Sequence, residues 1–306
     1  MLRFIIQRLI AAAVTIWITT IAVTLLIHAV PGDPVRIMYA KFQSTPEQIE
    51  AIRTSLGLDQ PIHLQYLSYL GRLFQGDLGR SIVGDQPVLD VLLTRFPPTL
   101  ALASASLFIA VVVGMSLGFF AAYRRGTASD ALAMVTAIVG VSMPHFWLGL
   151  LLLFFFSLEL QWLPVAGGDW RSLILPAMTL GLANAAVLAR LTRSAMIDIF
   201  DQDFVRTANA KGLPKSLVLY RHALRSGLVP IVSMMGLQFA YMMGGAIVVE
   251  NVFAWNGVGR LAIEAVFARD YPLIQGFILF FASVVVLVSV IIDVLYAVLD
   301  PRIRYS

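Results

Sequence analysis

The sequence predicts an all-α integral membrane protein with six transmembrane helices and a small helical extracytoplasmic subdomain. Of the 306 residues, 59% are hydrophobic and only 13% are charged, whereas soluble domains carry about 25% charged residues. The mean hydropathy is +0.83. Apolar runs of about 20 residues, the length that crosses a bilayer, occur six times. This composition excludes a soluble enzyme and a soluble nucleic-acid-binding protein.

The six apolar runs cover residues 9–30, 99–123, 131–158, 173–189, 228–249 and 273–299. The first follows Arg3 and Arg8, as the apolar core of a secretory signal would, but it is too long for a signal peptide and no small-residue cleavage site follows it. We therefore expect a retained helix over residues 1–30. The fourth run is short and contains Pro176, Gly181 and Asn184, which a helix tolerates when it packs inside a bundle.

Basic residues predict the orientation of the chain. With the N-terminus inside, residues 1–8, 124–130, 190–227 and 300–306 face the cytoplasm and hold 13 of the 22 Lys and Arg residues. Cytoplasmic loops of membrane proteins carry an excess of these residues, which also explains the pI near 9.5. We expect a multi-pass protein with both termini cytoplasmic, ending in a tail over residues 297–306.

Residues 31–98 are predicted to form the extracytoplasmic subdomain. Ser44 and Thr45 precede Pro46, a combination typical of a helix start, and Gly57 is placed to end that helix. A second helix is expected over residues 62–74, closed by Gly76. This subdomain either packs over the bundle or contacts a protein that delivers the cargo.

The cytoplasmic segment 190–227 predicts a helix over residues 194–210, a sharp turn and a second amphipathic stretch over 217–224. Gly212 can adopt the left-handed conformation that follows a helix, and Pro214 can open the next one. Small residues near this corner, Thr207 and Ala208 among them, would let another protein approach the backbone. A basic loop lying on anionic lipid is the alternative, which three Asp residues between positions 198 and 203 weaken.

Several kinds of chemistry have no sequence support. The chain has no P-loop, no H-E-x-x-H and no G-x-S-x-G motif, and no cysteine. Its four histidines lie on different predicted elements, without ligand spacing. We therefore expect a transport subunit with no catalytic residues, no cofactor and no resident metal.

Two ionisable residues fall inside predicted spans, where such residues suggest function. Asp293, near the inner end of the last span, is interpreted as a structural carboxylate. His145 follows Pro144, which interrupts the hydrogen-bond ladder of the third span. We expect a kink or widened turn at Pro144, with Met143, Pro144 and His145 on the translocation pathway. The alternative for His145 is a structural residue bonded to the carbonyls that the proline frees.

Nine segments in order give the sequence a resemblance to a known family. They are PGDP (31–34), LGLDQP (56–61), GDLGRS (76–81), GVSMPHFWLG (140–149), RTANAKGLP (206–214), HALRSGLVPIV (222–232), ENVFAWNGVGRL (250–261), RDYPLIQG (269–276) and DVLYAVLDPRIR (293–304). The chain resembles, over nearly its whole length, the permease subunits of bacterial ABC importers for dipeptides, oligopeptides, glutathione and nickel.

The resemblance implies the type I ABC importer permease fold, with a transmembrane domain over residues 95–296 in the bacterial inner membrane. It implies that segment 190–227 couples to an ATPase. The family motif E-A-A-x-x-x-G falls on Arg206, Thr207, Ala208 and Gly212, and Lys211 and Leu213 flank its glycine. Of the I-x-L-P motif that follows in the family, only the leucine, Leu224, is present.

The implied partners are a second homologous permease, two ABC ATPase subunits that hydrolyse the ATP, and an extracytoplasmic substrate-binding protein. The implied cargo is a di- or oligopeptide or glutathione. A nickel importer of the same family is the alternative, and the short loop 159–172 resembles both the glutathione and nickel branches. A self-contained secondary transporter is the alternative from another class, although few charges lie within the spans and no repeat is evident.

Overall fold

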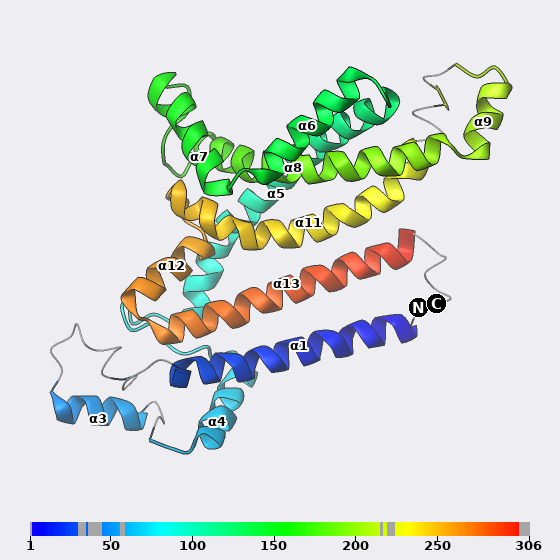
Figure 1. Ribbon diagram of the computed structural model, residues 1–306. Coiled ribbons are helices and arrows are strands. Elements are labelled where there is room, and N and C mark those ends of the chain that lie inside the picture. The colour runs from blue at the N-terminus through cyan, green and yellow to red at the C-terminus, as the bar shows by residue number, and fades with distance from the viewer. Residues whose placement is uncertain are drawn as a thin grey trace. The chain divides into compact units, whose positions relative to one another are not determined.

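The computed structural model describes residues 2–29, 35, 45–55, 59–214, 217–218 and 224–299. In these ranges the regular elements are helices, with one isolated β-bridge between Arg80 and Pro87. The chain divides into two compact units (Figure 1). One comprises Pro98–Asn256 and the C-terminal end from Ile291, and the other comprises Leu2–Pro97 and Gly257–Val290. The family-like motif at 31–34, the tail from residue 300 and most of the stretch 217–224 lie outside the described residues.

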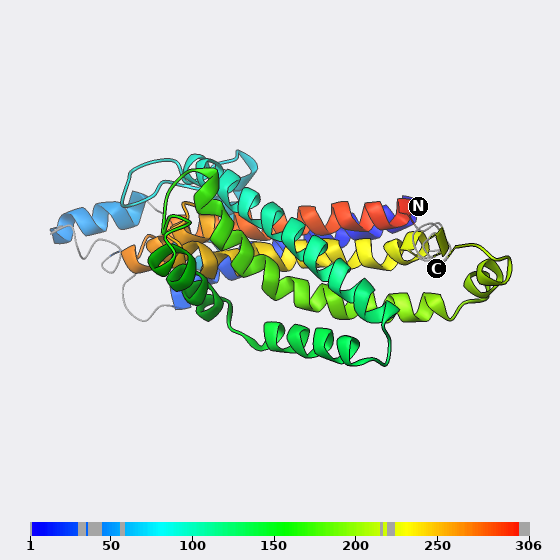
Figure 2. The same ribbon diagram turned by 90° about the horizontal axis from the view of Figure 1, so that it is seen from above.

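The central helix of the first unit is α8 (Trp170–Phe200), which packs against α5 (Val88–Tyr123), α6 (Ala128–Ser142) and α11 (Leu224–Val252) (Figures 1 and 2). The contact with α5 is close. A Cβ atom on Gly114 would lie 2.6 Å from the carbonyl oxygen of Ala185, and Gly118 meets Ala189 in the same way. Small residues let two membrane helices approach each other like this. The fourth predicted run is therefore part of a long helix at the centre of this unit.

The third predicted run is broken at Pro144. Helix α6 ends at Ser142, α7 (His145–Leu153) begins just after the proline, and the two axes are bent by 101°. Met143 has an extended backbone, the conformation that a following proline favours. Helix α7 then widens into the π-helix η1 (Phe154–Glu159). The run predicted as one span over residues 131–158 is therefore two helices that meet at a sharp bend at Pro144, where the sequence predicts a kink or widened turn.

The helix predicted over residues 194–210 is also two helices. Helix α8 ends at Phe200, and α9 (Asp203–Ala210) starts after a turn at Asp201 and Gln202. The amides of Asp201 and Gln202 still bond to Ile197 and Ile199 of the last turn. The apolar stripe continues on both sides of this turn, which is why the sequence pattern resembles one helix.

The second unit contains α1 (Leu2–Ala29), α3 (Pro46–Ser55), α4 (Ile62–Phe74), α12 (Val258–Ala268) and the neighbouring parts of α5 and α13 (Tyr271–Leu299). The two helices predicted over 46–56 and 62–74 are confirmed as α3 and α4. Helix α1 is held by hydrogen bonds from Gln275 Nε2 to the Val23 carbonyl (2.8 Å) and between the Thr20 and Tyr66 hydroxyls (3.0 Å).

Helix α5 begins at Val88 rather than at Thr99. Its first turns place Val88 and Leu92 in a buried cluster with residues of α12 and α13, namely Val258, Leu261, Ala265 and Leu273. The helix runs through Pro97 and Pro98, where the predicted extracytoplasmic subdomain ends. Burial of its first apolar turns therefore outweighs the backbone hydrogen bonds that the two prolines remove.

Within the part of the chain that the structure describes, four single helices, α1, α5, α8 and α13, are long and apolar enough to cross a membrane, and the bent pair α6–α7 would make a fifth span. Helix α11, with 29 residues, covers the remaining predicted run. The protein is thus a multi-pass helical membrane protein, and the count of six spans stays a prediction.

Candidate functional site

The predicted coupling corner is formed by α9 and the turn that follows it. The Lys211 amide bonds to the Thr207 carbonyl (3.0 Å) and the Gly212 amide to the Asn209 carbonyl (3.0 Å), which closes the helix. Gly212 then has a φ of +75°, the left-handed conformation that its place after the helix predicts. The turn redirects the chain at once toward Pro214, whose carbonyl accepts from the amides of Leu217 and Val218.

One side of the corner is anchored to the last turns of α8. Val205 and Ala208 are buried in a cluster with Met196 and Ile199, and Leu213 packs against it. The Leu213 amide reaches back to the Ala208 carbonyl (3.4 Å). Two of the six predicted coupling residues, Ala208 and Leu213, therefore hold the corner in place.

The other side of the corner is open. Arg206, Thr207, Lys211 and Gly212 are exposed, and a Cβ atom on Gly212 would meet no atom within 4 Å. Phe204 is 39% exposed at the start of α9. The corner thus presents Lys211, an Arg206–Asp203 ion pair (3.5 Å) and one aromatic ring to whatever faces it.

Two ion pairs brace the helices near this corner, and sequence reasoning found neither. Arg125 and Asp201 lie 3.0 Å apart, linking the turn after α5 to the end of α8. Asp130, only 5% exposed, accepts hydrogen bonds from Arg193 Nε (2.6 Å) and Nη2 (2.7 Å) and from the Gly126 amide (3.0 Å). A buried, bidentate Arg–carboxylate pair fixes α6 against α8 in both distance and orientation.

The three predicted pathway residues separate at the bend. Met143 and Pro144 line an open apolar cavity of about 580 Å³ together with Ile138, Val139, Ser142, Phe146 and Trp147. His145 does not line this cavity. It is half-buried, and its Nδ1 atom has no hydrogen-bond partner in the part of the chain that the structure describes. Its place on the pathway stays a prediction.

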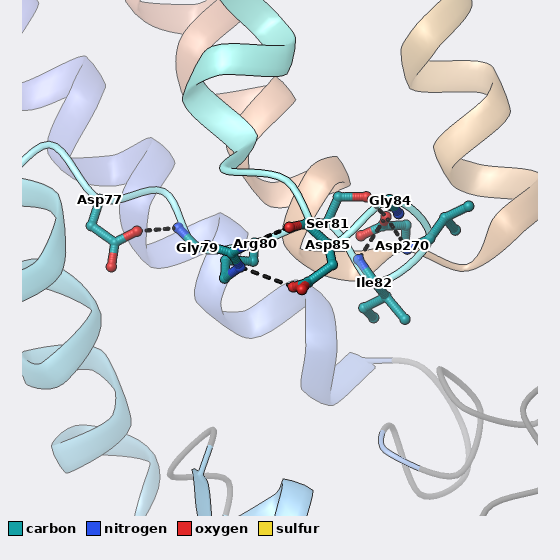
Figure 3. A network of polar contacts seen from close by, with 9 residues as sticks. Asp77, Gly79, Arg80, Ser81, Ile82, Gly84, Asp85 and Asp270 are labelled. Atoms are coloured by element: carbon teal, nitrogen blue, oxygen red, sulfur yellow. Dashed lines mark hydrogen bonds and ion pairs between the residues drawn. The ribbon is translucent and has the colours of Figure 1, made fainter.

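A polar network in the second unit organises the loop between α4 and α5 (Figure 3). Asp270, fully buried before α13, accepts from the Ser81 hydroxyl (2.5 Å) and from the amides of Ile82 (3.0 Å) and Val83 (3.4 Å). Its other oxygen caps α13 through the Leu273 amide (3.2 Å). One carboxylate thus joins segments 189 residues apart, and the GDLGRS and RDYP motifs lie together for this reason.

The described ranges contain no group of three or more His, Cys, Asp or Glu side chains that could hold a metal ion. Asp293, the other ionisable residue noted in a span, is half-buried on α13.

Two family models match the chain. One, described as "Binding-protein-dependent transport system inner membrane component", matches residues 114–305, and its N-terminal companion matches residues 1–103. The chain belongs to this family of ABC importer inner-membrane permeases. The permease is thus a transport component and not a catalytic subunit, and its family implies ATPase and binding-protein partners.

Close relatives and distant structures agree with this assignment. The permease is 46% identical over 307 aligned residues, covering both chains completely, to "Glutathione transport system permease protein GsiC" of Escherichia coli K12 and of Shigella dysenteriae serotype 1. Among solved structures it resembles the MetNI methionine ABC transporter, with a TM-score of 0.56 and 16% identity over 69% of this chain and 97% of that one. An amino acid ABC transporter gives a TM-score of 0.51 and 17% identity over 68% and 94%. These structures share the fold.

Proposed function

We propose that this permease forms half of the translocation pathway of an ATP-driven importer for glutathione or small peptides, and that the corner after α9 is where an ATPase subunit docks. The observation that carries the proposal is the two-sided corner. Ala208 and Leu213 fix it to α8, while Arg206, Thr207 and Lys211 stay exposed around the left-handed Gly212. The 46% identity to glutathione permeases over the whole length of the chain supports the choice of cargo.

The assembly in this proposal contains a second homologous permease, two ABC ATPases and an extracytoplasmic binding protein. Both termini and the corner face the cytoplasm, and residues 31–98 face outward. The domain boundaries follow the sequence analysis: a first helix over 1–30, the outer subdomain, a transmembrane domain over 95–296 that includes the coupling segment 190–227, and a tail over 297–306. The excess of Lys and Arg in the inner segments supports this orientation.

The cargo pathway in this proposal passes the bend at Pro144. Met143 and Pro144 already line an open cavity there. His145 adds a side chain that both donates and accepts hydrogen bonds, which suits a peptide backbone and also suits a nickel ion as cargo.

Reconstitution tests the proposal directly. The permease pair and the ATPases are placed in liposomes, and uptake of labelled glutathione, a dipeptide and Ni²⁺ is measured with the binding protein outside and ATP inside. We expect uptake of glutathione or dipeptide that requires both ATP and the binding protein. Preferred uptake of Ni²⁺ would establish the nickel alternative. Uptake by this chain alone, driven by an ion gradient, would establish a secondary transporter and overturn the proposal.

A further inference from the structure

A groove between α6 and α8 lies in the first unit, on the α6 side of the bundle. Its volume is about 230 Å³. Met134, Ala137, Ile138 and Val141 form its wall on α6, at the i, i+3, i+4, i+7 spacing that places residues on one helix face. Ala186, Arg190 and Arg193 line it from α8. Apart from the two guanidinium groups, the lining side chains are apolar.

The two arginines of the groove have different environments. Arg193 is fully engaged by Asp130, as described above. Arg190 is exposed, and within the described ranges no carboxylate or hydrogen-bond acceptor reaches it. Asp201 is engaged by Arg125, and Asp198 lies eight residues further along α8, or about 12 Å at 1.5 Å per residue. Among the described residues, one positive charge at the end of the groove is therefore uncompensated.

Residues 172–189 of α8 carry no charge and are about as long as a bilayer crossing, so we expect Arg190, the next charged residue, at a membrane interface. Arg190 lies ten residues before the end of α8, a candidate membrane span, and the nine residues before it are all buried or half-buried. Guanidinium groups at the edge of the hydrocarbon region reach for phosphate or water, because a charge without a partner is costly there. The apolar wall of α6 from Met134 to Val141 extends for about 10 Å.

We propose that this groove binds an anionic phospholipid. The lipid phosphate accepts hydrogen bonds from the Arg190 guanidinium, whose planar fork matches phosphate oxygens. One acyl chain lies along Met134, Ile138 and Val141. Basic pockets between transmembrane helices bind anionic headgroups by this combination of charge and apolar surface.

The chemistry of the groove favours a lipid over a peptide cargo. A peptide or glutathione could offer Arg190 a carboxylate, but it also carries amides and an ammonium group that need acceptors, and the groove lining offers two donors and no acceptor side chain. The inference needs only that the chain lies in a membrane, so it does not depend on which cargo the importer carries.

The test measures lipid retained by the purified full-length chain. The protein is delipidated, placed in nanodiscs that contain equal amounts of phosphatidylglycerol and phosphatidylcholine, re-extracted and examined by native mass spectrometry. We expect the wild type to retain phosphatidylglycerol at least fivefold over phosphatidylcholine. Arg190→Gln should abolish this preference, and Arg190→Lys should retain part of it, because a point charge replaces the fork.

Arg171→Gln is the matched control, since Arg171 is an exposed arginine near the other end of α8 whose guanidinium stacks on Trp170. It should keep the wild-type preference. Equal retention of both lipids by the wild type would overturn the proposal without any variant. An unchanged lipid preference in Arg190→Gln would also overturn the proposal. Loss of the lipid on addition of millimolar inorganic phosphate would overturn it as well, because that result would indicate a site for free anions. If Arg190→Gln weakens cargo uptake while lipid retention stays unchanged, Arg190 serves the cargo and the lipid site is refuted.

Discussion

Gly212 and Gly126 make a matched pair for testing the coupling corner. Their φ angles are +75° and +78°, and a Cβ atom at either position would meet nothing within 4 Å. The first side-chain atom of a Gln at either position therefore clashes with none of the described residues. The cost is that of holding an L-residue in the left-handed region, about 1–2 kcal/mol at both positions. Any difference between the two variants reports what surrounds each turn in the assembled complex.

We expect Gly126→Gln to retain most of the uptake and Gly212→Gln to lose at least tenfold. The added side chain at position 212 projects into the space that the proposed function assigns to the ATPase, whereas the proposed function assigns no partner to the turn at 126. Gly212→Asn should recover much of the loss, because Asn tolerates the left-handed conformation and is short. The assay is ATP-dependent uptake by the reconstituted complex, with the amount of ATPase that co-purifies with the permease as a second readout.

Two results would refute this reasoning. Normal uptake and normal ATPase recovery in Gly212→Gln would show that the corner is not a docking surface. Equal losses in the Gly126 and Gly212 variants would show that backbone strain alone accounts for the effect.

Three further predictions concern other parts of the chain. The chain has no cysteine of its own, so single introduced cysteines report topology without background. In intact spheroplasts an impermeant thiol reagent should label Gln75→Cys but not Asn209→Cys, and the reverse pattern would invert the proposed orientation. Hydrogen bonds to a charged group are worth about 1.5–3 kcal/mol each, and Asp270→Asn should weaken those that the carboxylate accepts. Amide exchange at Ile82 should therefore rise at least tenfold. Unchanged exchange would show that the carboxylate does not hold this loop. His145→Gln should keep most peptide uptake because an amide still donates and accepts, while His145→Leu should lower it, and full uptake by both would make the residue structural only.

Local signals in the sequence predicted the helices that begin and end at recognisable residues. Pro46 opens α3, as the sequence predicts, and α4 covers the expected residues 62–74 before Gly76. Gly212 adopts the left-handed conformation that its position after α9 requires. The break at Pro144 was expected at the right residue, although the 101° bend exceeds a kink because two separate helices meet there.

The remaining features depend on contacts between distant residues, which one sequence does not reveal. Asp270 and Ser81 are 189 residues apart, and Asp130 and Arg193 are 63 apart. Helix α12 was missed because residues 258–268 have no apolar run long enough for a span. The start of α5 at Val88 was missed because Pro97 and Pro98 suggest a loop until the buried cluster around Leu92 is known.

The packing of the corner determines how a displacement there would reach the rest of the first unit. Val205 and Ala208 are buried in the same cluster as Met196 and Ile199 of α8, so α9 cannot move far from α8 without exposing that apolar surface. Helix α8 approaches α5 at Gly114 and Gly118 too closely for either helix to slide freely, and the Asp130–Arg193 pair fixes α6 to α8. A force on the corner therefore moves α8 together with the helices packed on it, and the bend at Pro144 lies at the end of one of these helices, α6.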